Sequence, residues 1–475
     1  MDIKVIVSKL WALFPATLIV ALIMIGIGYV SYAIYRRRGG GKSVTKMQFA
    51  ALFLLLGWIV VVMTLTTFSR GPNFEGWVNL RLLSGYVSAW HQWSLSEWQL
   101  IIFNMIMFAP LGFLLPLLSK RTRRFLPVLC LSFLVTMGIE FVQVISRRGI
   151  FELDDLFHNT LGSIAGFLLM RAVLDSAEHR RLVGKSIVKG LAIPLTFVLL
   201  YSGAMLVYHT KELGNLSIRP SIPQNMERVD ITLTTDLPTS AEPVSLYYSD
   251  QIHSLSYGKE IAELIGHTFD LQRKGSVRVD GPNRMWPFFD HAGNEFAVIY
   301  NLNAGGWSLY TEADLASPTD EEELMRYKEH YESWMLSSGL MPVDASFNTQ
   351  DGNTLRWAKE QTVSDIAQGT SDYVDGLIML IPSTAYEIPQ DLFFTMKENQ
   401  FVRKVDLISP AVAYNEILKG EFSIYNNLES GDNLQVTDYE LAYMYDSKGY
   451  YQPVYMFVGM VNGQDWQSLI PAVRR

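Results

Sequence analysis

The chain has 475 residues, of which 49% are hydrophobic and only 18% are charged, and it contains one cysteine. Its formal net charge of −8 is unevenly distributed, because residues 1–209 hold 20 Lys and Arg against 9 Asp and Glu, whereas residues 210–475 hold 19 against 38. These values exclude a single soluble domain, and the acidity of the second half argues against a nucleic-acid-binding protein. We therefore expect a membrane domain joined to a water-soluble domain.

The first half contains six apolar segments that are long enough to cross a membrane, since a spanning helix needs about 20 mostly apolar residues. The segments are 11–35, 48–68, 99–118, 125–145, 157–174 and 187–208. The first has too long an apolar core for a cleavable signal peptide, and three arginines follow it where small residues would be expected. The sequence thus predicts an all-α bundle of six transmembrane helices.

Basic residues in alternate loops predict how this bundle lies in the membrane, because short cytoplasmic loops retain Lys and Arg. They follow the first, third and fifth segments: Arg36, Arg37, Arg38, Lys42, Lys46, Lys120, Arg121, Arg123, Arg124, Arg180, Arg181, Lys185 and Lys189. We therefore expect the N-terminus and the whole second half to lie outside. Cys130 has no partner for a disulfide within the chain, which favours the plasma membrane of a bacterium, best a Gram-positive one.

Polar side chains gather at the outer ends of the third, fourth and fifth segments. Such groups are costly inside a membrane and usually face the bundle interior. They are Asn104, Glu140, Gln143, Asp154, Asp155, His158 and Asn159. Antiparallel neighbouring helices would bring them all within roughly 10 Å of the outer surface. Arg147 and Arg148 lie in the loop after the fourth segment and add cations on the outer side, against the trend of the other loops.

These residues form an ordered set of motifs. In chain order they are Asn79-Leu80, Asn104-x-x-x-Phe108-Ala109-Pro110-Leu111-Gly112, Glu140-x-x-Gln143 and Arg148-Gly149-x-Phe151-Glu152-x-Asp154-Asp155-x-x-x-Asn159-Thr160-Leu161-Gly162. Because of these motifs, the chain resembles the VanZ-like family over roughly residues 50–175. It departs from the family pattern at Glu152, where Asp is usual, and at Gly138, near a usual Ser. The resemblance implies an envelope protein linked to low-level glycopeptide resistance, notably to teicoplanin, with no established reaction.

Three interpretations of this cluster remain open. In the first, a structural network fixes the helix register, with each interhelical bond contributing about 0.6 kcal/mol. In the second, Arg147 and Arg148 hold a phosphate or carboxylate while the acids orient hydroxyls or amides of a lipid head group. In the third, Glu140, Asp154 and Asp155 act on a lipid-linked substrate, by acid–base chemistry or around a divalent cation.

A non-enzymatic role is favoured, because no nucleophile and no His-ligand spacing accompany the acids. The predicted head-group-binding residues are Asn79, Asn104, Glu140, Gln143, Arg147, Arg148, Asp154, Asp155 and Asn159. No catalytic residue, metal site or cofactor is predicted, and the expected ligand is a membrane lipid or a lipid-linked envelope polymer. In the fifth segment, Gly162-x-x-x-Gly166 indicates close helix packing rather than a dimer interface.

The second half is expected to be an α+β domain of antiparallel strands and short helices. Residues 210–226 are predicted to be a linker and 227–475 the domain, with one lobe or two, divided near 340–405. Expected strands are 228–235, 243–249, 295–302, 306–310, 374–381, 391–396, 400–408, 421–426, 434–445 and 451–460. Expected helices are 257–267, 320–337, 355–368 and 410–419. A capping box, Thr319-x-x-Glu322, is expected to start the second helix, and a turn is expected at Asp351-Gly352.

The last segment, 405–462, is similar to PepSY-like and YycI-type regulatory ectodomains. Three runs carry the similarity: Ala413-Tyr414-Asn415-Glu416-Ile417-Leu418-Lys419-Gly420, Tyr439-Glu440-Leu441-Ala442-Tyr443 and Gln452-Pro453-Val454-Tyr455-Met456-Phe457. That similarity implies an extracytoplasmic module that binds or restrains a protein partner.

The predicted organisation of the first half is a first span with its basic loop (1–46), a VanZ-like bundle (47–175) and a sixth span (176–209). The predicted function is to bind or shield a lipid-linked surface-polymer anchor or precursor, while the outside domain docks a protein partner or senses the state of the envelope. The alternatives are a membrane-embedded envelope enzyme, or a regulator of a sensor kinase that acts through the outside domain.

Overall fold

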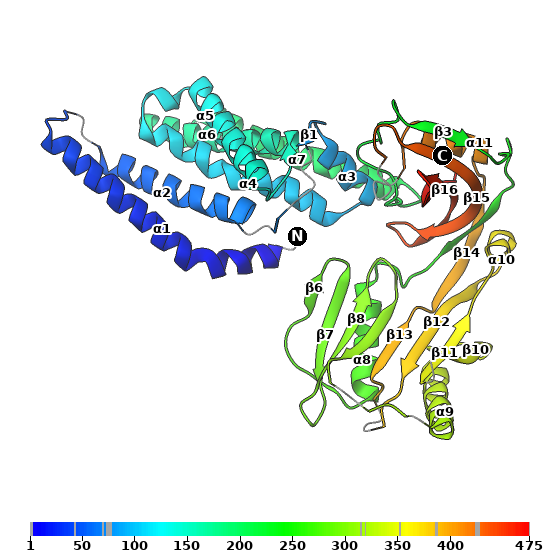
Figure 1. Ribbon diagram of the computed structural model, residues 1–475. Helices are drawn as coiled ribbons and strands as arrows, with labels where there is room; N and C mark the ends of the chain where they lie inside the picture. The colour runs from blue at the N-terminus through cyan, green and yellow to red at the C-terminus, as the bar shows by residue number, and fades with distance from the viewer. Residues whose placement is uncertain are drawn as a thin grey trace. The chain divides into compact units, whose positions relative to one another are not determined.

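A computed structural model describes residues 3–41, 44–68, 71–72, 78–313, 316–318, 320–350, 353–384, 388–422 and 428–474. The chain forms two compact units (Figure 1), which we call the membrane unit (Met1–Trp90 with Ser94–Lys211) and the C-terminal domain (His91–Trp93 with Glu212–Arg475). The first is helical, and the second combines strands with short helices. The predicted fold class, a six-span all-α bundle with an α+β domain, is confirmed.

Within the described residues, six helices of the membrane unit are long and apolar enough to cross a membrane. They are α1 (Ile3–Arg37), α2 (Lys46–Met63, continued by a π-helical segment, Thr64–Phe68), α4 (Leu95–Leu118), α5 (Phe125–Ile145), α6 (Leu153–His179) and α7 (Gly184–Thr210). A short helix, α3 (Ser84–Gln92), follows the strand β1 (Val78–Asn79), which pairs in parallel with β2 (Phe151–Glu152). Helix α6 begins four residues earlier than its apolar segment, because Asp154 and Asp155 fit the first turn of a helix.

Helices α4 and α6 make the closest contact of the membrane unit, and three glycines allow it. A Cβ atom on Gly162 would lie 2.0 Å from the carbonyl oxygen of Met105, and one on Gly166 would lie 1.9 Å from that of Ala109. From the other helix, a Cβ atom on Gly112 would lie 1.7 Å from the carbonyl oxygen of Ser163. The Gly162-x-x-x-Gly166 motif therefore serves packing within the chain.

The C-terminal domain is built on one connected sheet network. Its strands are β3 (Asp230–Leu233), β4 (Val244–Tyr248), β5 (Gln272–Arg273), β6 (Arg278–Asp280), β7 (Asn283–Phe289), β8 (Glu295–Asn301), β9 (Trp307–Thr311), β10 (Ser346–Gln350), β11 (Thr354–Lys359), β12 (Tyr373–Ile381), β13 (Asp391–Phe394), β14 (Lys397–Val405), β15 (Asn433–Tyr445), β16 (Tyr450–Val461) and β17 (Gln464–Pro471). Their order is β3-β15-β16-β4-β14-β12-β13-β9-β8-β7-β5, with β10–β11 beside β12, β17 beside β16 and β6 beside β7. Strands β3 and β15 pair in parallel, and the other pairs are antiparallel.

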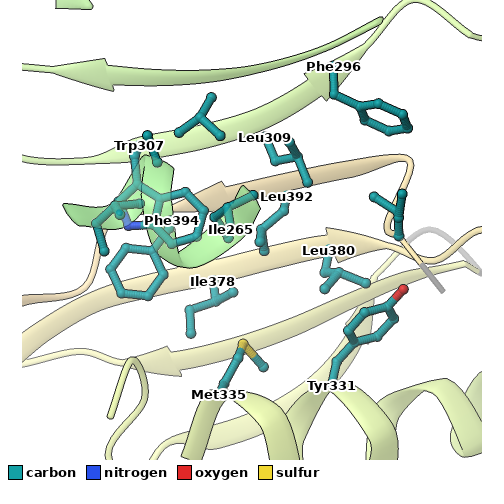
Figure 2. Close-up of a cluster of buried hydrophobic side chains, with 14 of the residues drawn as sticks. Ile265, Phe296, Trp307, Leu309, Tyr331, Met335, Ile378, Leu380, Leu392 and Phe394 are labelled. Atoms are coloured by element: carbon teal, nitrogen blue, oxygen red, sulfur yellow. The ribbon is translucent and has the colours of Figure 1, made fainter. Parts of the chain in front are cut away.

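Two hydrophobic cores lie against this network. In the first lobe, α8 (Leu255–Thr268) and α9 (Glu321–Ser337) pack on one face of strands β7 to β13, and Figure 2 shows Ile265, Tyr331 and Met335 of these helices among buried strand residues. In the second lobe, α10 (Val363–Gln368) and α11 (Pro410–Leu418) pack near β4, β15, β16 and β17. The second core takes strands from before and after the first lobe, so no single cut near 340–405 separates the two.

The segment 355–368 is wrongly predicted as one helix. Its first part is β11, in which Leu355 and Trp357 alternate with more exposed residues and are fully buried between β10 and β12. Only Val363–Gln368 is helical, after a cap in which the Thr362 side chain accepts from the Asp365 backbone N–H. Strands β5, β6, β7, β10 and β17 were not predicted from the sequence.

The predicted Asp351-Gly352 turn, Thr319 of the predicted capping box and 423–426 of the predicted strand 421–426 lie outside the described residues. Helix α9 begins after Asp320, whose side chain accepts a hydrogen bond from the Glu322 backbone N–H at 3.3 Å.

Residues 212–218, within the predicted linker 210–226, pack into the C-terminal domain. Glu212 forms a two-bond ion pair with Arg403. Leu216 and Ile218 are buried against Val454. The C-terminal domain therefore begins at Glu212, inside the predicted linker.

Candidate ligand-binding site at the ends of α4, α5 and α6

Two helices bury polar residues on the faces where they meet. Thr136, Glu140 and Gln143 follow one another on one face of α5, at spacings of four and three residues that keep side chains aligned. Their exposed fractions are 0%, 1% and 2%, and Asn159 on α6 is 3% exposed. These residues are buried although the helices around them are apolar, which is the placement that the sequence predicts for Glu140, Gln143 and Asn159.

Hydrogen bonds connect the cluster to its neighbours. Asn104 of α4 donates from Nδ2 to the Asp155 carboxylate of α6 at 2.5 Å. Glu140 accepts from the backbone N–H of Glu152 at 3.5 Å, which ties α5 to β2. Asn104, Glu140 and Asp155 thus each bridge two elements.

Asp154 has a different role from Asp155. Its carboxylate accepts hydrogen bonds from the backbone N–H groups of Leu83, at 2.5 Å, and Gly85, at 2.7 Å, and from the Ser84 hydroxyl at 3.2 Å. These three groups lie at the start of α3, so Asp154 acts as an N-cap supplied by another helix. Asn79 supports the same turn, because its Nδ2 donates to the Ser84 hydroxyl at 2.8 Å.

The two arginines lie at the edge of the cluster. Arg147 follows α5 by two residues, has a left-handed backbone at φ 53°, and its side chain is exposed. Arg148 is half-buried and donates from Nη1 to the carbonyl oxygen of Phe68 at 3.0 Å. Both cations therefore remain near the end of α5.

Several buried oxygens of the cluster have no hydrogen-bond partner among the described residues. They are Gln143 Oε1, Asn159 Oδ1, Thr136 Oγ1 and Thr160 Oγ1. A buried acceptor without a donor costs about 1–3 kcal/mol, so such groups usually bind water or a ligand. Gln143 and Asn159 each lie one helical turn after an acid, Glu140 on α5 and Asp155 on α6, so acceptor oxygens are concentrated in these turns of the two helices.

The structure also shows polar residues that sequence reasoning missed. Ser132 of α5 and Ser163 of α6 are fully buried, and their hydroxyls lie 2.6 Å apart. Ser132, Thr136 and Glu140 recur every four residues, and this spacing is the signal that would have extended the polar face deeper into the bundle. His158 pairs instead with Tyr86, with Nε2 2.9 Å from the hydroxyl oxygen.

These features define an integral membrane protein whose helix bundle encloses a polar cluster and precedes an α+β domain. Residues 49–174 match the family model described as VanZ/LLP1, which confirms the predicted VanZ-like resemblance. The family match contains all nine predicted site residues.

Two solved structures are similar to the C-terminal half. The Bacillus megaterium YpeB C-terminal domain is 13% identical with a TM-score of 0.20, covering 47% of this chain and 98% of its own. An uncharacterized protein from Eubacterium rectale is 10% identical with a TM-score of 0.19, covering 51% of this chain and 87% of its own. No curated protein matches the chain.

Proposed function

We propose that the membrane unit binds the polar head of a lipid-linked envelope polymer or of its precursor, and that this binding contributes to resistance to glycopeptides of the teicoplanin type. One observation carries the proposal: Gln143 Oε1 and Asn159 Oδ1 are buried without a hydrogen-bond partner among the described residues, and each lies one helical turn after an acid, Glu140 on α5 and Asp155 on α6. The VanZ/LLP1 match supports the link to glycopeptide resistance.

The chemistry of the site indicates how such a head group would lie. Amide and carboxylate oxygens accept from sugar hydroxyls, amide N–H groups or ammonium groups. Arg147 and Arg148, at the edge, suit the phosphate that joins a lipid to its head group. The proposed ligand therefore places its sugar or amine over Glu140 and Asn159 and its phosphate beside the arginines.

The membrane orientation is part of the proposal. With the basic loops in the cytoplasm, the N-terminus, the cluster and the C-terminal domain lie on the outer side, where envelope polymers are exposed. There the C-terminal domain would dock a protein partner or sense the state of the envelope. The membrane is the plasma membrane of a bacterium, best a Gram-positive one.

The test compares Glu140→Gln and Asn159→Leu with Glu178→Gln, which changes an exposed acid near the other end of α6. Teicoplanin susceptibility is measured in cells that express each variant, and membrane insertion is checked by immunoblotting of the membrane fraction. The first two variants are expected to lose resistance and the control to keep it. Native mass spectrometry of the wild-type protein in detergent should also show a co-purified lipid that Glu140→Gln lacks.

Resistance that survives both cluster substitutions at normal expression would contradict the proposal and leave the cluster with a structural role. Arg148→Ala provides a second check, because it removes the proposed phosphate contact at the edge while the buried acceptors stay.

A further inference from the structure

The sheet of the first lobe buries one of its two faces. Residues that pair directly on neighbouring antiparallel strands point to the same face. One such row crosses β7, β8, β9, β13, β12 and β11, and its members are at most 2% exposed: Trp286, Val298, Leu309, Leu392, Leu380 and Leu355. Helices α8 and α9 cover this face, and Figure 2 shows Leu309, Leu392 and Leu380 in the core beneath them.

The opposite face of the same strands is apolar as well. One residue along from the buried row, a second row pairs across β7, β8, β9, β13 and β12: Met285, Ile299, Ser308, Phe393 and Met379. Beside it on the same face runs a third row: Pro287, Ala297, Tyr310, Asp391 and Ile381. We call these ten residues the outer strip. Phe393 is 43% exposed and Tyr310 is 47% exposed, and in the described parts of the domain no residue of the strip belongs to a hydrophobic core.

The composition of the outer strip indicates a binding surface. The solvent face of an antiparallel sheet is normally polar, and contiguous exposed apolar surface marks sites of interaction. In the strip, only Ser308 and Asp391 lack a largely apolar side chain. The backbone groups of these strands are already paired within the sheet, so a partner would cover the face with side chains and not add a strand.

The size of the outer strip matches a single helix. Five strands about 4.8 Å apart and two rows about 7 Å apart give a footprint of roughly 24 Å by 14 Å. One side of a helix of about 15 residues has similar dimensions. Each subunit of a standard dimer buries about 800 Å², which is more than twice this footprint. The strip is therefore large enough for one helix and too small for a stable interface with a second copy of the chain.

The charge of the outer strip indicates what that helix carries. Asp391 lies between Tyr310 and Ile381, is half-buried, and forms no ion pair in the part of the chain that the structure describes. A helix laid over the strip would bury this carboxylate further, which is unfavourable unless the helix brings a cation. Residues 210–475 hold 38 Asp and Glu against 19 Lys and Arg, so the surrounding charge also favours a basic partner and opposes a second copy.

We propose that the outer strip docks a basic amphipathic helix of another polypeptide. The apolar side of this helix contacts Ile299, Phe393 and Met379, and one of its lysines or arginines pairs with Asp391. The docked helix covers the open face of the sheet as α8 and α9 cover the other face. This inference deepens the proposed role of the C-terminal domain in docking a protein partner, and it does not depend on the membrane cluster.

The test uses the full chain in amphipol, which leaves no free micelles to take up the probe. The probe is a fluorescein-labelled peptide of about 15 residues, made of leucine, alanine and lysine with the leucines on one side of the helix. A second peptide has glutamate in place of lysine. Dissociation constants are measured by fluorescence anisotropy, and the lysine peptide is expected to bind at least about tenfold more tightly than the glutamate peptide.

Two substitutions in the outer strip separate its apolar and its charged contribution. Phe393→Lys places a cation in the apolar surface and should weaken the lysine peptide at least about tenfold. Asp391→Asn keeps the size of the side chain and should weaken the lysine peptide several-fold without weakening the glutamate peptide. Because Asp391→Asn is so conservative, it tests the proposal even if Phe393→Lys lowers the unfolding midpoint of the protein.

Two exposed residues of the same lobe outside the strip provide matched controls. Val343→Lys matches Phe393→Lys, and Glu329→Gln in α9 matches Asp391→Asn. Both controls should bind the lysine peptide like the wild type, which separates docking from general attraction to an acidic domain. A benzoylphenylalanine on the apolar side of the peptide should form photo-cross-links to β8, β9, β12 or β13, as mapped by mass spectrometry.

Several results would overturn the proposal. Cross-links confined to other elements would do so, and so would equal affinities of the wild type and both strip variants for the lysine peptide. A wild-type dimer in native mass spectrometry that Phe393→Lys makes monomeric would assign the strip to a second copy instead. Phosphatidylglycerol vesicles that bind the wild type but not Phe393→Lys would assign it to a lipid surface. None of these measurements involves teicoplanin susceptibility, so failure of this inference is distinct from resistance that survives Glu140→Gln.

Discussion

Two adjacent acids of the membrane unit show how much one residue position matters. Asp154 accepts from the start of α3, whereas Asp155 accepts from Asn104 on α4. Successive residues on a helix point in directions about 100° apart, so neighbours in sequence face different elements. The sequence predicts both acids at the mouth of the fifth span, in the first turn of a helix, where the helix dipole favours carboxylates. It does not say which one faces α3, since that depends on packing between distant segments.

The cap leads to a prediction at Asp154. Asp154→Ala leaves the first N–H groups of α3 without an acceptor and should lower the stability of the membrane unit by about 1–2 kcal/mol. The loss is measured as a lower midpoint of thermal unfolding in detergent, with size-exclusion chromatography detecting the folded fraction at each temperature. Glu178→Ala, an exposed acid of the same helix, should leave the midpoint unchanged. An Asp154→Ala midpoint equal to that of the wild type would argue against the cap.

Lys397 leads to a prediction on pH. Burial lowers the pKa of its amino group below the usual 10.5, and the charge of Asp375 opposes this effect without cancelling it. Between the folded-state pKa and 10.5 the folded domain binds fewer protons than the unfolded chain, so stability rises with pH across that window. Below the window the buried ammonium group costs stability. Lys397→Met should therefore raise the unfolding midpoint of the C-terminal domain at neutral pH and abolish its increase in alkaline buffer.

The measurement is thermal unfolding of the full chain at neutral and alkaline pH, with tryptophan fluorescence as the signal. Lys274→Met, which changes an exposed lysine of the same lobe, is the control and should keep the wild-type pH dependence. A lower midpoint for Lys397→Met at both pH values would show that the charge stabilises the domain.

Among the elements, the contact between α4 and α6 depends on the absence of side chains. Gly162→Ala would place a methyl group 2.0 Å from the Met105 carbonyl oxygen, so the helices would have to separate. Overpacking of this kind costs about 1–3 kcal/mol. Gly138→Ala, in α5, meets no atom within 4 Å and should be neutral or slightly stabilising. Thermal unfolding in detergent distinguishes the two variants. Equal unfolding midpoints for Gly162→Ala and Gly138→Ala would contradict the tight contact.

Elements with a strong local pattern are predicted well from the sequence. The six spans, α8, α9, α11 and the hairpin of β15 and β16 follow from apolar length, periodicity or turn residues. Strand β11 does not, because Thr354–Lys359 has no long alternation and precedes a true helix start at Thr362. Its conformation is determined by pairing with β10 and β12, which the local pattern does not encode.

At the scale of the whole molecule, the proposed orientation can be tested directly. In a Cys130→Ser background, Glu242→Cys places a thiol on an exposed loop of the C-terminal domain, and Lys185→Cys places one at the exposed first turn of α7, in the basic segment between α6 and α7. A membrane-impermeant maleimide should label the first in intact cells and the second only after permeabilisation. The reverse pattern would place the C-terminal domain in the cytoplasm.

The order of the domains follows from the sequence, but the internal order of the C-terminal sheet does not. Strands β3 and β4 precede the first lobe, yet they pair with β14, β15 and β16 that follow it. Such pairings join residues far apart in the chain and leave no local pattern. The buried Ser132 and Ser163 pair of the membrane unit was missed for a similar reason, because small hydroxyl residues are ordinary in apolar helices.

The glycine contact of α4 and α6 has a consequence for the biogenesis of the protein. Helix α6 is the least hydrophobic of the six spans, and it carries Asp155 and Asn159. A segment of this kind partitions poorly into lipid by itself. Helix α4 is synthesised before α6. Its Asn104 donates a hydrogen bond to Asp155, and glycines let the backbones of the two helices approach closely. We therefore expect α6 to leave the translocation machinery only while α4 is still next to it, so that the two helices enter the bilayer as a pair.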